Sequence, residues 1–123
     1  MSNNIDDQAE MPNEQSIATY LNKLEIAALN PMQEEACEAI QSKSDVVLLS
    51  PTGTGKTLAF LLPIIEKLDP NCDEIQTMIL VPSRELAQQI EQVARKIGSG
   101  FKINAVYGGR AGMYDKIDLK HRP

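Results

Sequence analysis

The clearest candidate for a functional site is one short segment, SPTGTGKT, at positions 50–57. Gly53 and Gly55 carry no side chains, so the backbone N–H groups around them can curl around a phosphate. Lys56 follows at the expected start of a helix, where a cation is electrostatically unfavourable unless an anion lies in front of it. The segment therefore predicts a phosphate-binding loop, in which the hydroxyl of Thr57 would be offered to Mg²⁺.

A simpler interpretation is a glycine-containing turn between a strand and a helix, with an incidental lysine. Gly-x-Gly alone would favour that interpretation. Gly-x-Gly-Lys-Thr between an expected strand and an expected helix favours nucleotide binding instead. The strict pattern has Gly where this chain has Ser50, and this departure bears on which kind of nucleotide-binding protein the chain is.

A phosphate-binding loop needs a strand before it and a helix after it. Residues 45–49 (DVVLL) form a short apolar run that is typical of a buried parallel strand. Residues 56–68 predict a helix that is apolar on nearly every side and is bent by Pro63. Two further apolar runs, at 77–81 and 102–107, predict a second and a third strand.

Three further segments show helical spacing or helix boundaries. Ser83 is suited to cap a helix that Gly98 ends, and Asn30 and Pro31 are suited to cap and begin an earlier one. A first helix is expected from Ser16. The apolar residues expected on the inner faces are Ile17, Leu21, Leu24 and Ala28, then Met32, Ala36, Ala39 and Ile40, then Leu86, Ile90, Val93 and Ile97. Residues 111–123 carry little pattern.

The order of strands, loops and helices is typical of a parallel α/β sheet with right-handed crossovers. Three strands make a poor sheet on their own, because a parallel sheet needs both faces covered and its edges protected. Residues 16–123 therefore predict the N-terminal part of a larger domain. Residues 1–15 are polar and acidic, and they predict a disordered arm.

Composition narrows the classes of function. The net charge of −5 and the pI near 4.8 argue against binding nucleic acid by bulk charge, but they allow contact through a few placed arginines. Cys37 and Cys72 are the only cysteines, which suggests reduced thiols in a cytosol. The longest apolar run, at 58–65, is too short to span a bilayer. We expect a cytoplasmic protein with no membrane partner.

Four segments in order resemble the motifs of DEAD-box RNA helicases. Residues 50–57 resemble motif I, where the first position is usually Ala, and residues 30–33 (NPMQ) resemble the end of the Q motif. Residues 81–87 (VPSRELA) resemble motif Ia, and Gly108 with Gly109 resembles the paired glycines that follow the third strand. The resemblance implies a P-loop NTPase with a RecA-like parallel sheet flanked by helices.

The resemblance also implies a role for each matching residue, with ATP and Mg²⁺ as cofactors. Gln33 would bind the adenine edge, because its amide offers a donor beside an acceptor. The phosphates would lie on Ser50, Pro51, Thr52, Gly53, Thr54, Gly55, Lys56 and Thr57, of which Lys56 and Thr57 would serve catalysis and Thr57 would hold the metal. The RNA sugar–phosphate backbone would contact Pro82, Ser83, Arg84 and Gly109, without reading sequence.

Each of these assignments has a structural alternative. Gln33 lies three residues after Asn30, so it could close a capping box. Arg84 could be a solvated residue of a first helical turn, and the paired glycines could be only a turn. The family has an aromatic residue where this chain has Ser16, and Tyr20, the nearest aromatic, is a poor candidate for stacking on adenine.

No Asp-Glu-Ala-Asp segment occurs in the chain. The resemblance implies that the whole protein is an RNA-stimulated ATPase that unwinds short RNA duplexes with the help of a second RecA-like domain. The 123 residues alone would bind nucleotide weakly and show no appreciable turnover, because metal placement and charge neutralisation would be incomplete. The alternatives are a DNA helicase or another P-loop ATPase, or a nucleotide-binding module that catalyses nothing.

Overall fold

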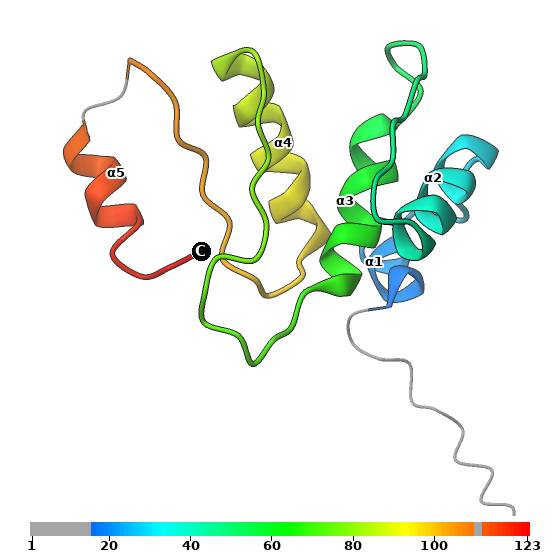
Figure 1. Ribbon diagram of the computed structural model, residues 1–123, viewed down its shortest axis with the longest axis horizontal. Coiled ribbons are helices and arrows are strands. Elements are labelled where there is room, and N and C mark those ends of the chain that lie inside the picture. Colours follow the sequence, from blue (N-terminus) through cyan, green and yellow to red (C-terminus); the bar gives the residue numbers. More distant parts are fainter. Residues whose placement is uncertain (1–15, 110–111) are drawn as a thin grey trace, which may run out of the picture.

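The computed structural model describes residues 16–109 and 112–123, so the arm predicted at 1–15 lies outside the described residues. The described part contains five helices: α1 (Ile17–Lys23), α2 (Pro31–Ser42), α3 (Lys56–Lys67), α4 (Arg84–Ile97) and α5 (Gly112–Asp118). Helices α1, α2 and α3 are grouped at one side, α4 follows, and α5 lies at the far side (Figure 1). This order places α3, the helix after the predicted phosphate loop, against three of the others.

The hydrophobic core forms where α1, α3 and α4 meet. Tyr20, Leu62 and Ile97 are fully buried, and Leu61, Ile65 and Ala94 complete the cluster. Fully burying an aliphatic side chain of this size contributes about 1.5–3 kcal/mol. The apolar face predicted for α4 is therefore confirmed, since it ends on the buried Ile97.

Polar side chains join the same helices at their ends. Glu66 of α3 accepts one hydrogen bond from the backbone N–H of Ile17 at 3.0 Å and another from the Gln41 side chain at 2.6 Å. Lys23 of α1 donates to the carbonyl of Gly98, which ends α4 at a φ of 66°. These bonds fix α1 and α2 against α3, and α1 against α4, near the core.

Local capping signals explain where α2 and α4 begin. Asn30 caps α2 and Pro31 occupies its first turn, as predicted. Ser83 caps α4 by accepting a hydrogen bond from the backbone N–H of Leu86 at 3.2 Å. Gly98 takes the left-handed conformation that ends α4, which a glycine adopts without strain. The helix predicted at 56–68 is also confirmed.

The first helix is shorter than predicted. Helix α1 ends at Lys23, and the next turn places Glu25 at a φ of 57°, which takes the chain out of helical geometry. Ala28 therefore lies outside the helix and is exposed, so its predicted place on the inner face was wrong. The inner face of α2 is also rotated from the predicted stripe, because its buried residues are Gln33, Ala36 and Cys37.

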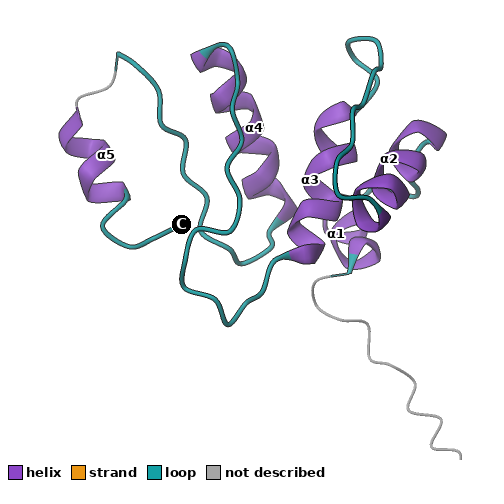
Figure 2. Cartoon of the chain, in the orientation of Figure 1, coloured by secondary structure: helices purple, strands orange, loops and turns teal. Residues whose placement is uncertain are grey.

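The three predicted strands are not formed. Residues 45–49, 77–81 and 102–107 are loops, and no strand is present among the residues that the structure describes (Figure 2). Residues of the second and third segments line a common pocket. No backbone–backbone hydrogen bond pairs any of the three segments with another in this part of the chain (Figure 1). A strand needs a neighbouring strand for its N–H and C=O groups, so extended apolar sequence alone does not make a sheet.

Exposure within the segments at 45–49 and 77–81 still follows the alternation of a half-buried strand. Val47 is 85% exposed while Val46 is 39% exposed, and Leu80 is 87% exposed while Ile79 is 39% exposed. One row of side chains therefore faces the helices and the other faces away from them. Helix α5 was not predicted, and its apolar residues Met113 and Ile117 are also exposed.

Candidate nucleotide-binding and RNA-binding site

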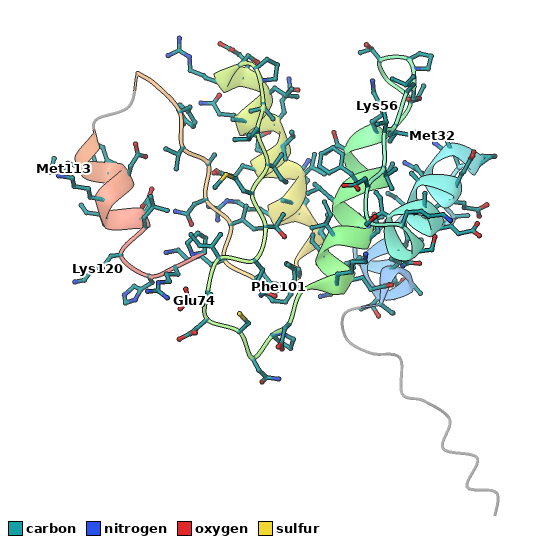
Figure 3. All side chains as sticks on the ribbon, in the orientation of Figure 1. Met32, Lys56, Glu74, Phe101, Met113 and Lys120 are labelled. Atoms are coloured by element: carbon teal, nitrogen blue, oxygen red, sulfur yellow. The ribbon has the colours of Figure 1, made fainter. Side chains whose placement is uncertain are left out.

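The predicted functional residues gather at one end of the molecule. The loop at 50–57, the start of α4 after Pro82, and the turn at Gly108 and Gly109 all lie at the upper edge of Figure 1. Lys56 lies at this end of α3, and Met32 of the neighbouring α2 lies close to the same end (Figure 3). In open α/β folds, ligands bind where the chain passes from an extended segment into the next helix.

The loop at 50–57 is closed by its own hydrogen bonds. The ammonium group of Lys56 donates to the carbonyl of Ser50 at 2.7 Å. The hydroxyl groups of Ser50 and Thr54 lie 2.6 Å apart, and Thr54 also donates to the carbonyl of Pro51 at 2.7 Å. The departure at position 50 thus has a physical explanation, because a glycine there would offer Thr54 no hydroxyl partner.

The start of α3 lacks the usual protein cap. Gly55 precedes the helix at a φ of 86°, makes no side-chain cap hydrogen bond, and no acidic residue occurs in the first turn. The hydroxyl of Thr57 makes no hydrogen bond within the described part of the chain. The positive end of the helix and the Lys56 ammonium therefore have no negatively charged cap from the first turn of α3. A phosphate would supply that charge.

Gln33 joins the start of α2 to this loop. Its side-chain oxygen accepts from the backbone N–H of Asn30 at 2.9 Å, and the Asn30 side chain accepts from the N–H of Gln33 at 2.9 Å. The capping-box alternative is thus confirmed. The amide nitrogen of Gln33 also donates to the carbonyl of Gly55 at 3.1 Å, and Asn30 donates to the carbonyl of Thr54 at 3.0 Å. The contact from Asn30 was not predicted, because its capping role gave no sign of a second partner.

Arg84 and Gly109 are brought together from distant parts of the sequence. A Cβ atom built on Gly109 would lie 2.6 Å from the Nη1 atom of Arg84, and Gly109 has a φ of 84° that favours glycine. Arg84 also lies 3.8 Å from the carboxylate of Glu85, but both side chains are mostly exposed, so this ion pair contributes little. Pro82 and Ser83 are exposed beside Arg84. The four predicted RNA contacts thus form one exposed group.

Comparison with known proteins decides the family. The sequence model of the family described as "DEAD/DEAH box helicase" matches residues 30–122. The chain belongs to the DEAD/DEAH box helicase family. Membership implies a RecA-like P-loop fold, although the described residues carry helices and no strand.

Similar proteins come from plants, bacteria and fungi. The chain is 42% identical over 95 residues to DEAD-box ATP-dependent RNA helicase 12 of Arabidopsis thaliana, covering 76% of this chain and 19% of that protein. It is 47% identical over 95 residues to the probable ATP-dependent RNA helicase YfmL of Bacillus subtilis (strain 168), covering 76% of this chain and 25% of the relative.

A fungal relative shows the same partial coverage. The chain is 42% identical over 89 residues to ATP-dependent RNA helicase dhh1 of Neurospora crassa, covering 72% of this chain and 16% of the relative. No solved structure matches the chain. The chain thus spans a quarter or less of the length of these helicases.

Tyr20 lies in the core and outside the predicted site. Its side chain is fully buried in the core, and its hydroxyl is without a hydrogen-bond partner in the described residues. Burial, followed by the nearby Glu66 carboxylate, raises the pKa of this phenol. Ser16, which occupies the family's aromatic position, caps α1 by accepting from the N–H of Thr19 at 3.3 Å. Neither residue is placed to stack on a base.

The cysteines and the acidic side chains are the other candidate reactive groups of this helicase-family chain. Both cysteines are free thiols: Cys37 is buried against α3 and Cys72 is exposed. No group of three or more His, Cys, Asp or Glu side chains could hold a metal ion in residues 16–109 and 112–123. The predicted metal ligand is therefore the Thr57 hydroxyl alone. None of the described helices has the length and apolar character needed to cross a membrane.

Proposed function

We propose that this chain is the ATP-binding part of an ATP-dependent RNA helicase, an RNA-stimulated ATPase that unwinds short RNA duplexes. The observation that carries the proposal is the uncapped start of α3, led by Lys56, at the same end of the molecule as the contact between Arg84 and Gly109. Family membership supports ATP as the nucleotide and RNA as the nucleic acid. The relatives named above are ATP-dependent RNA helicases.

The phosphates of ATP would lie on residues 50–57. Lys56 would exchange its neutral partner, the Ser50 carbonyl, for a charged phosphate oxygen, and the contact would then join two opposite charges. The first N–H groups of α3 would bind the same phosphates. Mg²⁺ is a hard cation that takes oxygen ligands and phosphates, and the Thr57 hydroxyl suits it.

Gln33 keeps capacity to bind adenine while it holds the loop. Its amide group has two N–H donors and an oxygen with two lone pairs. One donor is used by the Gly55 carbonyl and one lone pair by the N–H of Asn30. One donor and one lone pair are left, which is the pair of groups that the adenine edge needs.

RNA would contact the exposed group of Pro82, Ser83, Arg84 and Gly109. A guanidinium group offers two parallel donors to a phosphate, and a glycine allows the backbone to approach closely. These groups bind the sugar–phosphate backbone and carry no sequence information. Since the chain has a net charge of −5, attraction of RNA is local to this end rather than spread over the surface.

Hydrolysis requires parts that these residues do not supply. A carboxylate to anchor the metal and orient water, and arginines to neutralise the developing charge, would come from the rest of the helicase and its second RecA-like domain. The segments at 45–49, 77–81 and 102–107 would become strands of the parallel sheet once further strands pair with them. The alternating exposure of the first two segments supports this, because it leaves one apolar face available on each of them.

Binding of a fluorescent ATP analogue with Mg²⁺, and of a fluorescent single-stranded RNA, tests the proposal. Lys56→Ala should abolish ATP binding, whereas Lys67→Ala at the other end of α3 should not. Arg84→Ala should weaken RNA binding by about tenfold, the equivalent of one charge-assisted contact, whereas Lys96→Ala in the last turn of α4 should change it little. ATP binding that persists in Lys56→Ala would contradict the proposal. RNA-stimulated hydrolysis by these 123 residues would contradict the part that assigns no turnover to them.

A further inference from the structure

Helix α4 presents a row of charged side chains to the segment at 102–109. Glu91 follows Arg84 by seven residues and Arg95 follows it by eleven. At 3.6 residues per turn these spacings place all three within about 20° of one line along the helix. This charged row is separate from the apolar side of α4, which buries Ala94 and Ile97 in the core.

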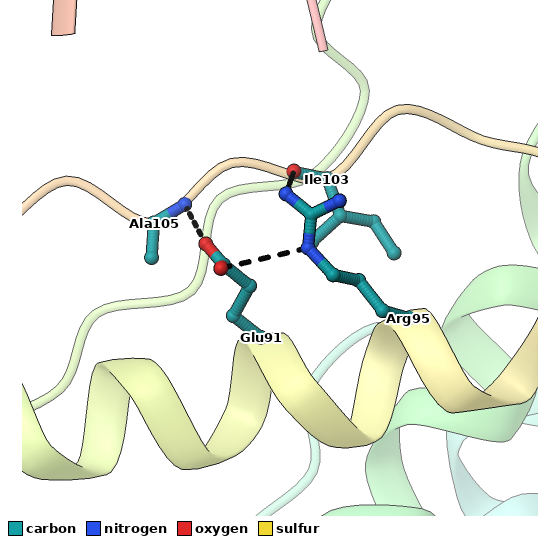
Figure 4. A network of polar contacts seen from close by, with 4 residues as sticks. All are labelled: Glu91, Arg95, Ile103 and Ala105. Atoms are coloured by element: carbon teal, nitrogen blue, oxygen red, sulfur yellow. Dashed lines mark hydrogen bonds and ion pairs between the residues drawn. The ribbon is translucent and has the colours of Figure 1, made fainter. Parts of the chain in front are cut away.

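Two members of the row bind the backbone of the extended segment (Figure 4). The Glu91 carboxylate accepts from the backbone N–H of Ala105 at 2.7 Å. The Arg95 guanidinium donates to the carbonyl of Ile103 at 2.8 Å, and its Nε atom lies 3.5 Å from the Glu91 carboxylate. The glutamate is the more buried of the two, with 29% of its side chain exposed.

The pattern of these two bonds matches that of a parallel sheet. In a parallel ladder one residue of the neighbouring strand donates to the carbonyl of residue i−1 and accepts from the N–H of residue i+1. Arg95 and Glu91 donate and accept at Ile103 and Ala105, on either side of Asn104. The side-chain pair thus takes the place of one strand residue and satisfies backbone groups for which the segment has no strand partner.

The third member of the row meets the end of the same segment. Arg84 lies against Gly109, so the segment runs antiparallel to α4, with Ile103 at Arg95, Ala105 at Glu91 and Gly109 at Arg84. The two spans are comparable, since eleven helical residues cover about 16 Å and six extended residues cover about 20 Å. Three contacts therefore fix the register of the segment on the helix.

We propose that Glu91 and Arg95 are positioning residues that, by holding the backbone at 103–105, set where Gly109 meets Arg84. The inference rests on the proposed RNA contacts of Arg84 and Gly109, and it adds residues that touch neither RNA nor ATP. Loss of the two bonds frees the middle of the segment, and the turn at Gly109 then loses its fixed place. RNA affinity falls while ATP affinity, which depends on α3, is unchanged.

A simpler role for the pair is to stabilise α4 as an ion pair between residues four apart, which contributes about 0.3–0.5 kcal/mol on an exposed helix. A charge swap separates the two roles. The double variant Glu91→Arg with Arg95→Glu keeps an ion pair, but it puts a donor opposite the N–H of Ala105 and an acceptor opposite the carbonyl of Ile103. Glu91→Gln does the reverse, because it loses the charge and keeps an oxygen that accepts from Ala105.

The experiment measures exchange of the Ala105 amide hydrogen and affinity for single-stranded RNA in the 123-residue chain. In Glu91→Leu and in the charge swap, exchange should be about tenfold faster and RNA affinity about tenfold lower, with ATP affinity unchanged. Glu91→Gln should stay within about threefold of the unsubstituted chain in both. A charge swap that behaves like the unsubstituted chain overturns the proposal.

The two readouts also separate this proposal from the proposed function. Unchanged Ala105 exchange in Glu91→Leu shows that the backbone is not held by Glu91, and it overturns the positioning role. Faster exchange with unchanged RNA affinity overturns it as well. If the unsubstituted chain binds no RNA, the proposed RNA contacts are refuted and the positioning role falls with them, while the exchange data still report whether Glu91 holds Ala105.

Discussion

Replacing Gly55 by alanine tests how the predicted phosphate loop is held against α2. Gly55 has a φ of 86°, and a Cβ atom there would lie 2.5 Å from the amide nitrogen of Gln33. Gly53, two residues earlier, has a φ of 83°, and nothing lies within 4 Å of its Cβ position. An alanine at either position therefore has the same backbone strain, and only an alanine at position 55 also clashes with a side chain. Gly53→Ala is the matched control.

The expected cost follows from these two terms. A left-handed conformation costs an L residue about 1–2 kcal/mol, and this term applies to both variants. At Gly55 the alanine also displaces the Gln33 amide, which breaks its bond to the Gly55 carbonyl and adds about 0.5–1.5 kcal/mol. We expect Gly55→Ala to lower the free energy of unfolding by about 2–3 kcal/mol, which is about 1 kcal/mol more than Gly53→Ala.

Urea unfolding followed by circular dichroism measures both variants. A double-mutant cycle with Gln33→Ala isolates the clash, because the displaced amide is then absent. In that background Gly55→Ala should cost about 1 kcal/mol less than it does in the unsubstituted chain, whereas the cost of Gly53→Ala should not change. Equal costs for the two glycines, or additive effects of Gly55→Ala and Gln33→Ala, would refute this account of the loop.

Three further predictions concern the buried groups. Tyr20→Phe removes a buried hydroxyl that lacks a partner in the described residues. In urea titrations it should leave the free energy of unfolding unchanged or raise it by up to about 1 kcal/mol. A clear loss of stability would contradict this. Iodoacetamide should label the exposed Cys72 in the folded protein and leave the buried Cys37 unlabelled until urea is added. Mass spectrometry measures both labels. Equal labelling of the two cysteines in the folded protein would be inconsistent with the structure. Burial, and then Glu66, raises the pKa of Cys37 above the ordinary 9.0 of a thiol and the pKa of Tyr20 above the ordinary 10.0 of a phenol. The stability that each group contributes is therefore present below its ordinary value and is lost as the pH rises above it. The urea midpoint should therefore stay level up to about pH 9 and fall at higher pH, and the fall should be smaller in a variant carrying Cys37→Ala with Tyr20→Phe.

Features set by neighbours in sequence were predicted well. The caps Asn30 and Ser83 and the terminator Gly98 act within one turn of their helices, so the start of α2 and both ends of α4 followed from the sequence. The end of α1 did not, because the turn at Glu25 depends on how the chain passes from α1 to α2. Helix α5 was missed, since its short apolar stripe does not stand out from the residues around it.

Features set by distant partners were predicted poorly. The runs at 45–49, 77–81 and 102–107 have the composition of buried strands, but strand formation depends on hydrogen-bond partners that the described residues do not provide. The same limit applies within the site. Spacing predicted that Gln33 could close a capping box, yet nothing in the sequence indicated that its amide would reach Gly55.

The predicted binding residues also divide into those that local chemistry indicates and those that a family resemblance indicates. The loop at 50–57 was predicted from local chemistry, because the glycines and Lys56 act on a phosphate directly. The group of Pro82, Ser83, Arg84 and Gly109 came from a resemblance, and the structure supplies the contact between Arg84 and Gly109. Their roles toward ATP and RNA remain predictions.

The central claim is that the loop at 50–57 binds the phosphates of ATP through Lys56. Titration of the ¹⁵N-labelled chain with Mg²⁺ and ATP, followed by NMR, tests it most directly. The account predicts that the amide resonances of Gly53, Gly55 and Thr57 shift first and furthest, that the Gln33 side-chain amide also shifts, and that Lys56→Ala removes these changes. Shifts that are confined to other parts of the chain, or that persist unchanged in Lys56→Ala, would contradict the claim.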